Sequence, residues 1–266
     1  MDTKWRLIES GPCDAFYNMA LDEAIATEVR RGSAPPTLRM YGWDRPSVTL
    51  GCFQKTSSLD MEYCNAQDIP VVRRPTGGRA ILHGDELTYS FSARTDKGAF
   101  SHGLLDSYRR ISTAFSLAFN KVGVTASSKK EREKGRVLSR SPLCFQSSSY
   151  GEILTENKKL VGSAQKRWTN GLLQQGSVPY LCQEEKLAGI FGVEKTTALR
   201  DCMKALKDIL PLLDENTFRK AVASSFEEAF GIRLLLSAPS PEESLLAGEL
   251  RHRKYLQDHW NLRQLP

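Results

Sequence analysis

Three strand-like segments joined by tight turns place the strongest limit on the fold. They read "YGEILT", "KKLVGSAQKRW" and "GLLQQGSVPY" and occupy residues 150–155, 158–168 and 171–180. Glu156-Asn157 joins the first two and Asn170-Gly171 joins the last two, and Asn-Gly is a strong hairpin-turn dipeptide. Strands joined by such short turns pair antiparallel. The sequence therefore predicts an antiparallel meander just after Cys144.

The rest of the chain alternates between strand-like and helix-like patterns. Short segments rich in β-branched and aromatic residues predict strands at 4–9, 37–41, 47–53, 70–74 and 86–93. Apolar residues at helical spacing predict one helix between the cap Asp14 and Gly32, and a longer central helix over 101–122. More helices follow Cys182, one of them capped by Asp214. These patterns predict an α/β (α+β) fold in which mixed, mainly antiparallel β-sheets are flanked by helices.

The length and composition fit a globular protein with a main body and a small appendage. We expect a catalytic-size domain over 1–235 and a helical extension over 236–266 that packs on it. The apolar fraction of 40% is ordinary, and no apolar run is long enough to cross a bilayer. Residues 1–10 do not resemble a secretory signal. The expected compartment is the cytoplasm.

The cysteines and the net charge narrow the classes of site and partner. The six cysteines form no CxxC pair, which fits neither a zinc knuckle nor a disulfide framework, so free thiols are expected. The net charge of +6 favours acidic partners, although charge alone does not choose among nucleic acid, a membrane surface and an acidic protein.

The first candidate site is "RRPTGGRAILH", residues 73–83. Two arginines at a strand end precede paired glycines, which let the main chain approach a ligand or phosphate closely. The alternative is a tight turn that needs a positive φ. His83 is either a general base or a hydrogen-bonded structural residue. The sequence contains neither a P-loop nor a Rossmann fingerprint.

The second candidate is the thiol of Cys144, which lies just ahead of the meander. A thiol becomes a nucleophile when its thiolate is stabilised, and Lys159 could supply the positive charge. The alternatives are a small buried side chain for Cys144 and a solvated strand residue for Lys159. Ser163 and Gln165 could likewise be ordinary strand residues.

Taken together, "RRPTGGRAILHGDELTYSF" and "KLVGSAQKR...LLQQGSV" resemble the biotin/lipoyl protein ligase superfamily. The resemblance extends from "WRLIESG" and "FYNMALDEA" through "RMYGWDRPSVTLGCFQ" into the C-terminal helices, so it covers most of the chain. Within the superfamily the sequence is most similar to the LipM-type octanoyltransferases, which carry a cysteine in a "CF" dipeptide, here Cys144-Phe145. The resemblance implies the biotin/lipoyl ligase catalytic-domain fold with C-terminal helices.

The resemblance also implies a reaction and its partners. Cys144 would attack the thioester of octanoyl-acyl carrier protein and hold the octanoyl group as a thioester. The group would then pass to a lysine of a lipoyl domain, such as that of the glycine cleavage H protein. No ATP, metal or other cofactor is implied, and neither a nucleic acid nor a membrane is an implied partner.

The same resemblance assigns roles to individual residues. Lys159 would be the second catalytic residue, lowering the pKa of the thiol and polarising the acyl carbonyl. The first motif would line one side of the acyl pocket with Arg73, Gly77, Gly78 and His83. Gly162, Ser163 and Ala164 would form another wall. An eight-carbon chain would require an apolar tunnel behind them.

Departures from the family pattern leave alternatives open. Gln175 stands where the family usually has histidine, and Gln146 stands where an acidic residue is common. ATP-dependent lipoate ligases usually have a third glycine where this chain has Arg79. The remaining alternatives are an amidotransferase between lipoyl domains, an ATP-dependent lipoate or biotin ligase, and a non-catalytic binding module. The basic segment 129–140 is either a docking patch for an acidic partner or a solvated loop.

Overall fold

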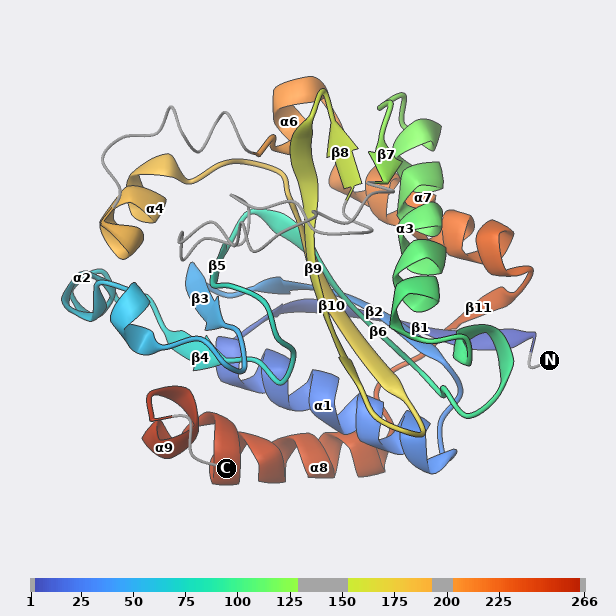
Figure 1. Ribbon diagram of the computed structural model, residues 1–266, viewed down its shortest axis with the longest axis horizontal. Coiled ribbons are helices and arrows are strands. Elements are labelled where there is room, and N and C mark those ends of the chain that lie inside the picture. Colours follow the sequence, from blue (N-terminus) through green and yellow to red (C-terminus); the bar gives the residue numbers. More distant parts are fainter. Residues whose placement is uncertain (1–2, 129–152, 193–202, 264–266) are drawn as a thin grey trace.

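The computed structural model describes residues 3–128, 153–192 and 203–263, which form a large and a small sheet with helices around them (Figure 1). The eight-stranded sheet has the order β11-β1-β2-β6-β10-β9-β8-β7. Its strands are β1 (Lys4–Cys13), β2 (Thr37–Trp43), β6 (Glu86–Ala93), β7 (Ser127–Ser128), β8 (Ile153–Thr155), β9 (Lys158–Arg167), β10 (Leu172–Pro179) and β11 (Arg233–Leu236). Only the pairs of β1 with β2 and β11 are parallel among the described strands of this sheet. The predicted fold class and the predicted meander, β8-β9-β10, are confirmed.

Helices α1 (Ala15–Arg31) and α8 (Pro241–Leu250) lie side by side below the large sheet in Figure 1. Helix α1 begins where the side chain of Asp14 accepts hydrogen bonds from two main-chain N–H groups. It ends at Gly32, whose φ of 83° lies in the left-handed region that favours glycine. Both predicted helix ends are confirmed. Helix α8 is tied to β1 by an ion pair between Arg6 and Glu243.

Helices α3 (Leu104–Lys121) and α7 (Glu215–Phe230) pack together over the other face of the sheet (Figure 1). Their core is aromatic: the rings of Phe115 and Phe226 meet edge to face with centroids 5.7 Å apart, and Phe91 of β6 lies 5.8 Å from Phe226. The predicted central helix over 101–122 is therefore present and begins at Leu104. The predicted cap Asp214 accepts the main-chain N–H of Thr217.

The small sheet has the order β4-β3-β5 and is built from β3 (Ser47–Leu50), β4 (Val71–Arg73) and β5 (Ile81–His83). Its apolar side chains pack with those of α2 (Met61–Ala66) and α4 (Glu184–Phe191). The strand predicted over 47–53 ends at Leu50. Beyond it, the carbonyl oxygens of Gly51, Cys52 and Gln54 accept hydrogen bonds from the guanidinium of Arg73.

The remaining described elements are short. They are η1 (Thr56–Ser58), η2 (Gly98–Phe100), α6 (Leu206–Ile209), the π-helical turn η4 (Arg251–Tyr255) and α9 (Asp258–Asn261). Strand β11 was not predicted, and the division predicted after residue 235 falls inside it. Within the described ranges, no helix has the length and apolar character needed to cross a membrane. Cys144, Gln146 and the whole segment 129–140 lie outside the described residues.

Candidate functional site

The two sheets face each other across a small cavity, which we call the first hollow. It has about 290 Å³ of empty space, its opening included. The exposed part of its lining is almost wholly apolar. The residues that line it come from α1, from both sheets and from the turn after β4: Met19, Tyr41, Trp43, Thr49, Arg74, Ile81, His83, Thr88, Ala164, Gln175 and Gly176. The first hollow thus brings together His83 and Ala164, two site residues predicted from motifs far apart in the sequence.

The paired glycines form a tight turn that Arg74 holds in place. Its Nη2 donates hydrogen bonds to the carbonyl oxygens of Gly77 at 2.6 Å and of Arg79 at 2.8 Å. Gly78, between them, has a φ of 86°, which favours glycine. A Cβ on Gly78 would lie 3.4 Å from the Cβ of Ala164. The glycines therefore let the main chain approach the wall of the first hollow.

Arg73 lies apart from the first hollow, although it precedes Arg74 directly. Its guanidinium is fully buried and is surrounded by main-chain carbonyl groups. The oxygens that accept its hydrogen bonds belong to Gly51, Cys52, Gln54, Trp260 and Asn261. In return, the indole N–H of Trp260 donates to the carbonyl oxygen of Arg73 at 2.8 Å. Arg73 therefore joins the small sheet to α9.

His83 is fixed by three contacts at the edge of the first hollow. Its Nδ1 lies 2.7 Å from Oε1 of Glu86, and its Nε2 lies 2.8 Å from the hydroxyl of Thr49. Arg74 donates to the Thr49 oxygen at 3.1 Å, so the hydroxyl hydrogen remains for Nε2 of His83. The imidazole also stacks on Trp43, with ring centroids 4.1 Å apart. This arrangement fits the tautomer that carries its hydrogen on Nδ1.

Glu86 is a buried carboxylate with three hydrogen-bond donors. Burial by itself would raise the pKa of Glu86, but the neighbouring His83 and hydrogen bonds from His83, Thr88 and Ser177 outweigh it. The pKa of Glu86 is consequently below its usual value. The hydroxyl of Ser177 donates to Oε2 at 2.7 Å. Glu86 thus connects His83 of the small sheet to β6 and β10 of the large one.

The lowered pKa of Glu86 predicts a loss of stability in acid. A carboxyl whose pKa is lower in the folded than in the unfolded state stabilises the fold above the unfolded pKa, and this contribution is lost as the pH falls through the folded pKa. In urea titrations from pH 7 to pH 3, Glu86→Gln should lower the free energy of unfolding at pH 7 by about 1–3 kcal/mol. The variant should also lose less further stability below about pH 4.5 than the wild type does.

A matched control is Glu228→Gln, which removes an exposed ion pair with Lys121 on the surface of α7. Surface pairs contribute little to stability, so this variant should follow the wild type. Equal pH dependence of the wild type and Glu86→Gln would contradict the role given to Glu86.

Beneath the first hollow, Asp22 of α1 accepts hydrogen bonds from several side chains. Arg39 donates to its Oδ1 at 2.7 Å, and both side chains are fully buried. Tyr41 donates to Oδ2 at 2.8 Å, and Ser90 donates to Oδ1 at 2.6 Å. Such a charge is tolerated in the interior because its partner and its hydrogen bonds are all in place. Asp22 therefore anchors α1 to β2 and β6.

Gln175 extends this network to the glycine turn. Its Nε2 donates to Oδ2 of Asp22 at 2.8 Å, and its Oε1 accepts the hydroxyl of Thr76 at 2.9 Å. The amide thus donates on one side and accepts on the other at the same time. Where the family usually has histidine, this chain has a side chain that bridges α1 and the residue before the paired glycines.

Met19 and Trp43, which line the first hollow, and Asp22 beneath it were not predicted from the sequence, and Gln175 was noted only as a departure from the family pattern. One signal was available for α1: Asn18 and Asp22 are polar, lie one helical turn apart and fall on the stripe that buries Ile25 and Val29. Polar residues on a buried stripe need partners. The partners themselves, Arg39 and Tyr41, are not visible without the fold.

Lys159 of β9 is 1% exposed, and an irregular strand pairing sets the direction of its side chain. The pairs Ile153–Val161 and Leu154–Lys159 leave Leu160 without a partner, which makes it the extra residue of a β-bulge. Leu160 and Val161 both enter the core under α3 and α7. Alternation across the strand then places Lys159 on the face of Gly162, which is the face of the first hollow.

The Gly-Ser-Ala wall is divided between the two faces of β9. Ala164 pairs with Gln175 and lines the first hollow, and Gly162 pairs with Ser177 on the same face. Ser163 lies on the opposite face, where its hydroxyl hydrogen-bonds to Tyr89 under α3. The structure therefore brings Ala164 to the first hollow, places Gly162 on the same face of β9 and directs Ser163 away from it.

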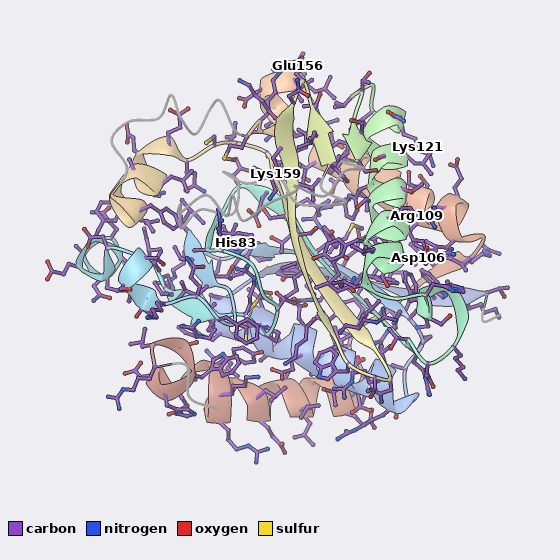
Figure 2. The ribbon with its side chains drawn as sticks, viewed as in Figure 1. His83, Asp106, Arg109, Lys121, Glu156 and Lys159 are labelled. Atoms are coloured by element: carbon purple, nitrogen blue, oxygen red, sulfur yellow. The ribbon has the colours of Figure 1, made fainter. Side chains whose placement is uncertain are left out.

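The region around the first hollow lies apart from the charged surface of α3. Figure 2 shows His83 and Lys159 well away from Asp106, Arg109 and Lys121, which lie along α3. In the described part of the chain, no group of three or more His, Cys, Asp or Glu residues is arranged to hold a metal ion. What the site offers is an apolar hollow, a buried lysine on the same face of β9 and a fixed imidazole.

Comparison with known families identifies a catalytic-domain family. The family model of the lipoyl protein ligase A/B catalytic domain matches residues 14–227. Octanoyltransferase LipM of Kyrpidia tusciae is 37% identical over 274 residues, which cover 98% of this chain and 99% of that protein. Octanoyltransferase LipM of Bacillus subtilis is 32% identical over 273 residues, with 98% of both chains covered.

Solved structures agree with the fold. A lipoate-protein ligase A bound with ATP superposes with a TM-score of 0.82 at 23% identity, and all of both chains is covered. A bipartite lipoate protein ligase from Thermoplasma acidophilum superposes with a TM-score of 0.83 at 21% identity, covering 99% of this chain and 98% of that one. These superpositions confirm the architecture.

Proposed function

Because the chain belongs to the lipoyl protein ligase A/B catalytic-domain family and matches LipM octanoyltransferases over nearly its full length, we propose a covalent route for its reaction. The protein is an acyltransferase that moves octanoyl groups in lipoate biosynthesis. The proposal concerns how it does so: through an octanoyl thioester on Cys144, from octanoyl-acyl carrier protein to a lysine of a lipoyl domain.

The observation that carries the proposal is the first hollow, together with the face of β9 on which Lys159 lies. An almost wholly apolar lining suits a saturated acyl chain, which has no groups to hydrogen-bond. Met19, Trp43 and Ile81 are among the apolar side chains that line it. The thioester carbonyl would then lie at the polar end of the chain, on the side of Lys159 and the glycine turn. Gly77, Gly78, His83, Gly162 and Ala164 are the proposed pocket residues.

The reaction proceeds in two steps, acylation of Cys144 and transfer to the acceptor lysine. The Cys144 thiolate attacks the donor thioester, so that a new C–S bond forms, the donor's C–S bond breaks and the donor leaves as a thiolate. The neutral acceptor amine then attacks the acyl-enzyme: a C–N bond forms, the C–S bond to Cys144 breaks, and the proton that the amine loses is taken up by the departing Cys144 sulfur or by water. Since a thioester keeps the acyl group activated, no nucleotide is needed in either step.

Lys159 assists both steps through its charge. Its ammonium group stabilises the thiolate and the negative charge that develops on the carbonyl oxygen. Lys159 is buried, and fixed charges act more strongly where water is excluded. Arg73, by contrast, is proposed as a structural residue because its donors are directed at main-chain oxygens and not at the first hollow.

The test is transfer without nucleotide, followed by intact mass. The protein is mixed with octanoyl-acyl carrier protein, and we expect its mass to increase by one octanoyl group that hydroxylamine releases. Adding an apo lipoyl domain should then move the group to the domain and restore the original mass.

Each alternative gives a different result in the same assay. A ligase would require ATP and free octanoate and would form no thioester. An amidotransferase would accept the octanoyl group from an octanoylated lipoyl domain and not from the acyl carrier protein. Transfer in the absence of any acyl-enzyme would contradict the covalent route.

A further inference from the structure

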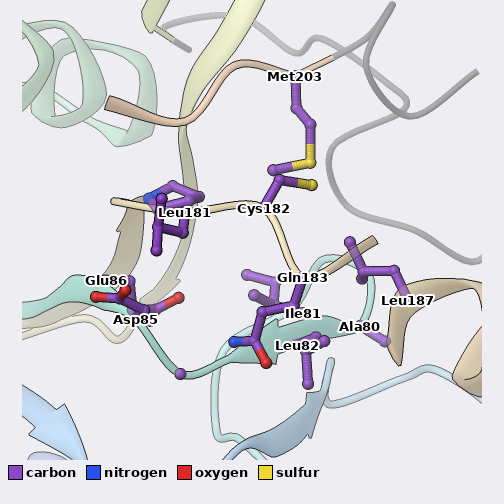
Figure 3. A pocket seen from close by; sticks show the side chains of 12 residues that line it. Ala80, Ile81, Leu82, Asp85, Glu86, Leu181, Cys182, Gln183, Leu187 and Met203 are labelled. Carbon is purple, nitrogen blue, oxygen red and sulfur yellow. The ribbon is translucent and has the colours of Figure 1, made fainter. Parts of the chain in front are cut away.

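A second hollow lies next to the first. It has about 400 Å³ of empty space, its opening included, and its lining comes from the residues around β5 and from the segment that follows β10. Figure 3 shows Asp85, Leu181, Cys182, Gln183 and Met203 around it. Its exposed lining has more polar surface than that of the first hollow. The second hollow thus differs in character from the apolar pocket assigned to the acyl chain.

The two hollows meet at one side chain. Ile81 lines both of them and packs with Met203 and Cys182 on the side of the second hollow. Met203 in turn forms a parallel bridge with Lys159, and the N–H of Lys204 donates to the carbonyl oxygen of Lys159 at 3.0 Å. The second hollow is therefore next to the strand that carries Lys159, across Ile81 from the first.

The first hollow, the strand that carries Lys159 and the second hollow correspond to the three parts of a thioester donor. An acyl thioester has an apolar chain, then the reacting carbonyl and sulfur, and then the arm that carries the thiol. With the chain in the first hollow and the carbonyl on the side of Lys159, the second hollow lies where the arm would extend. We propose that the second hollow binds the amide-bearing thiol arm of the acyl donor, an assignment that rests on the proposed function.

Gln183 is the side chain best suited to recognise an amide in that arm. It is half-buried and lies against Gly84, because a Cβ on Gly84 would lie 2.2 Å from its Nε2. Lys186 donates to its Oε1 at 3.2 Å, which orients the amide group. An oriented carboxamide can both donate to and accept from a neighbouring amide. Leu181, which is 48% exposed, lies at the rim and covers the apolar part of the arm.

The second hollow should contribute less to binding the acceptor lysine than to binding the donor. A lysine side chain is a short chain of methylene groups with a single amine and has no amide before its own main chain. Hydrogen-bond recognition at Gln183 would therefore favour the donor in the first step and be neutral in the second. We therefore expect changes in the second hollow to affect the acylation of Cys144 and to leave the transfer to the acceptor lysine unchanged.

The experiment compares two octanoyl thioesters as donors: S-octanoyl-pantetheine, whose arm contains amides, and S-octanoyl-2-mercaptoethanol, whose arm has none. Acyl-enzyme formation is followed by intact mass. Gln183→Leu should reduce the wild-type preference for the pantetheine donor, measured as a ratio of kcat/KM values, by about tenfold, the effect of one lost hydrogen bond to a substrate. The ester without amides should react as before.

Leu181→Trp, which narrows the rim, should slow acylation by the pantetheine donor while leaving the preformed octanoyl-enzyme able to transfer to a lipoyl domain at the wild-type rate. Leu212→Trp is the matched control, since Leu212 is 98% exposed and does not line either hollow.

An unchanged donor preference in Gln183→Leu would overturn the assignment. So would an equal slowing of deacylation in Leu181→Trp, because the second hollow would then belong to the acceptor. If the wild type forms an octanoyl-enzyme neither with these thioesters nor with octanoyl-acyl carrier protein, the proposed function itself fails, and that result is distinct from both of the others.

Discussion

Cys144→Ala is expected to lower octanoyl transfer by about 10³-fold or more, which is the scale of losses seen when a catalytic nucleophile is removed. Without the thiol no acyl-enzyme forms, and direct attack by a lysine amine on a bound thioester lacks the activated intermediate. The measurement is the initial rate of octanoylation of a lipoyl domain, with intact mass to detect the adduct. Free energies of unfolding for the variant and the wild type show whether the fold is retained.

The control for Cys144→Ala is Cys13→Ala, in which another thiol is removed from the end of β1. Burial raises the pKa of Cys13 and of Cys64, so at neutral pH both are less ionised than an ordinary thiol. Brief treatment with iodoacetamide at pH 7 should therefore label Cys144 before either of them. Labelling of Cys13 or Cys64 first, or full activity in Cys144→Ala, would contradict the nucleophile assignment.

Lys159→Met is expected to lower the rate of transfer by about 10²–10³-fold, the typical cost of removing one stabilising group from a developing oxyanion. The substitution keeps a similar volume and removes the ammonium group of a buried side chain. A residue with only a structural role would lower the rate no further than the loss of folded protein accounts for. The measurements are the transfer rate and a urea titration of the same preparation.

A second readout separates the charge of Lys159 from its shape. If the ammonium group stabilises the thiolate, the rate of alkylation of Cys144 should reach half its maximum at a higher pH in Lys159→Met than in the wild type, and Lys159→Arg should recover part of the difference. The matched control is Lys166→Met on the same strand, whose amine lies 4.9 Å from the Trp168 ring. An unchanged alkylation profile in Lys159→Met would show that Lys159 does not act on the thiol.

Elements whose signals are local were predictable from the sequence. Helix α1 was predictable because a capping aspartate, a regular apolar stripe and a terminal glycine occur together. Strands β9 and β10 were predictable because the Asn170-Gly171 dipeptide marks a turn between two strand-like runs, although neither residue has the positive φ of a two-residue hairpin turn. Strand β11 was missed because it is a short edge strand that depends on its pairing with β1. Local sequence patterns therefore predict helices and central strands, whereas an edge strand such as β11 depends on long-range pairing.

The candidate site was predictable only in part, because a motif does not reveal which way each side chain points. Arg73 and Arg74 are neighbours in one motif, yet Arg74 holds the glycine turn and Arg73 binds α9. Likewise, Ser163 lies between two residues of the site face and points to the other side of the sheet. In both cases alternation along a strand separates adjacent residues, and the sequence does not show where the alternation starts.

Irregular pairing limited the prediction further. Regular alternation from Ala164 back along β9 would put Lys159 on the side of α3, because the two positions differ by an odd number of residues. The bulge at Leu160 reverses that parity. Such a bulge depends on the partner strand β8 and leaves no mark in the residues of β9 alone.

The ring of carbonyl oxygens around Arg73 makes α9 part of the support for the site. Trp260 and Asn261 of α9 supply oxygens to a guanidinium at the end of β4, and the neighbouring Arg74 holds the glycine turn. If α9 were displaced, this cation would stay inside the fold with part of its hydrogen bonding missing. The small sheet beside the first hollow is therefore braced by Trp260, which lies 187 residues further along the chain than Arg73.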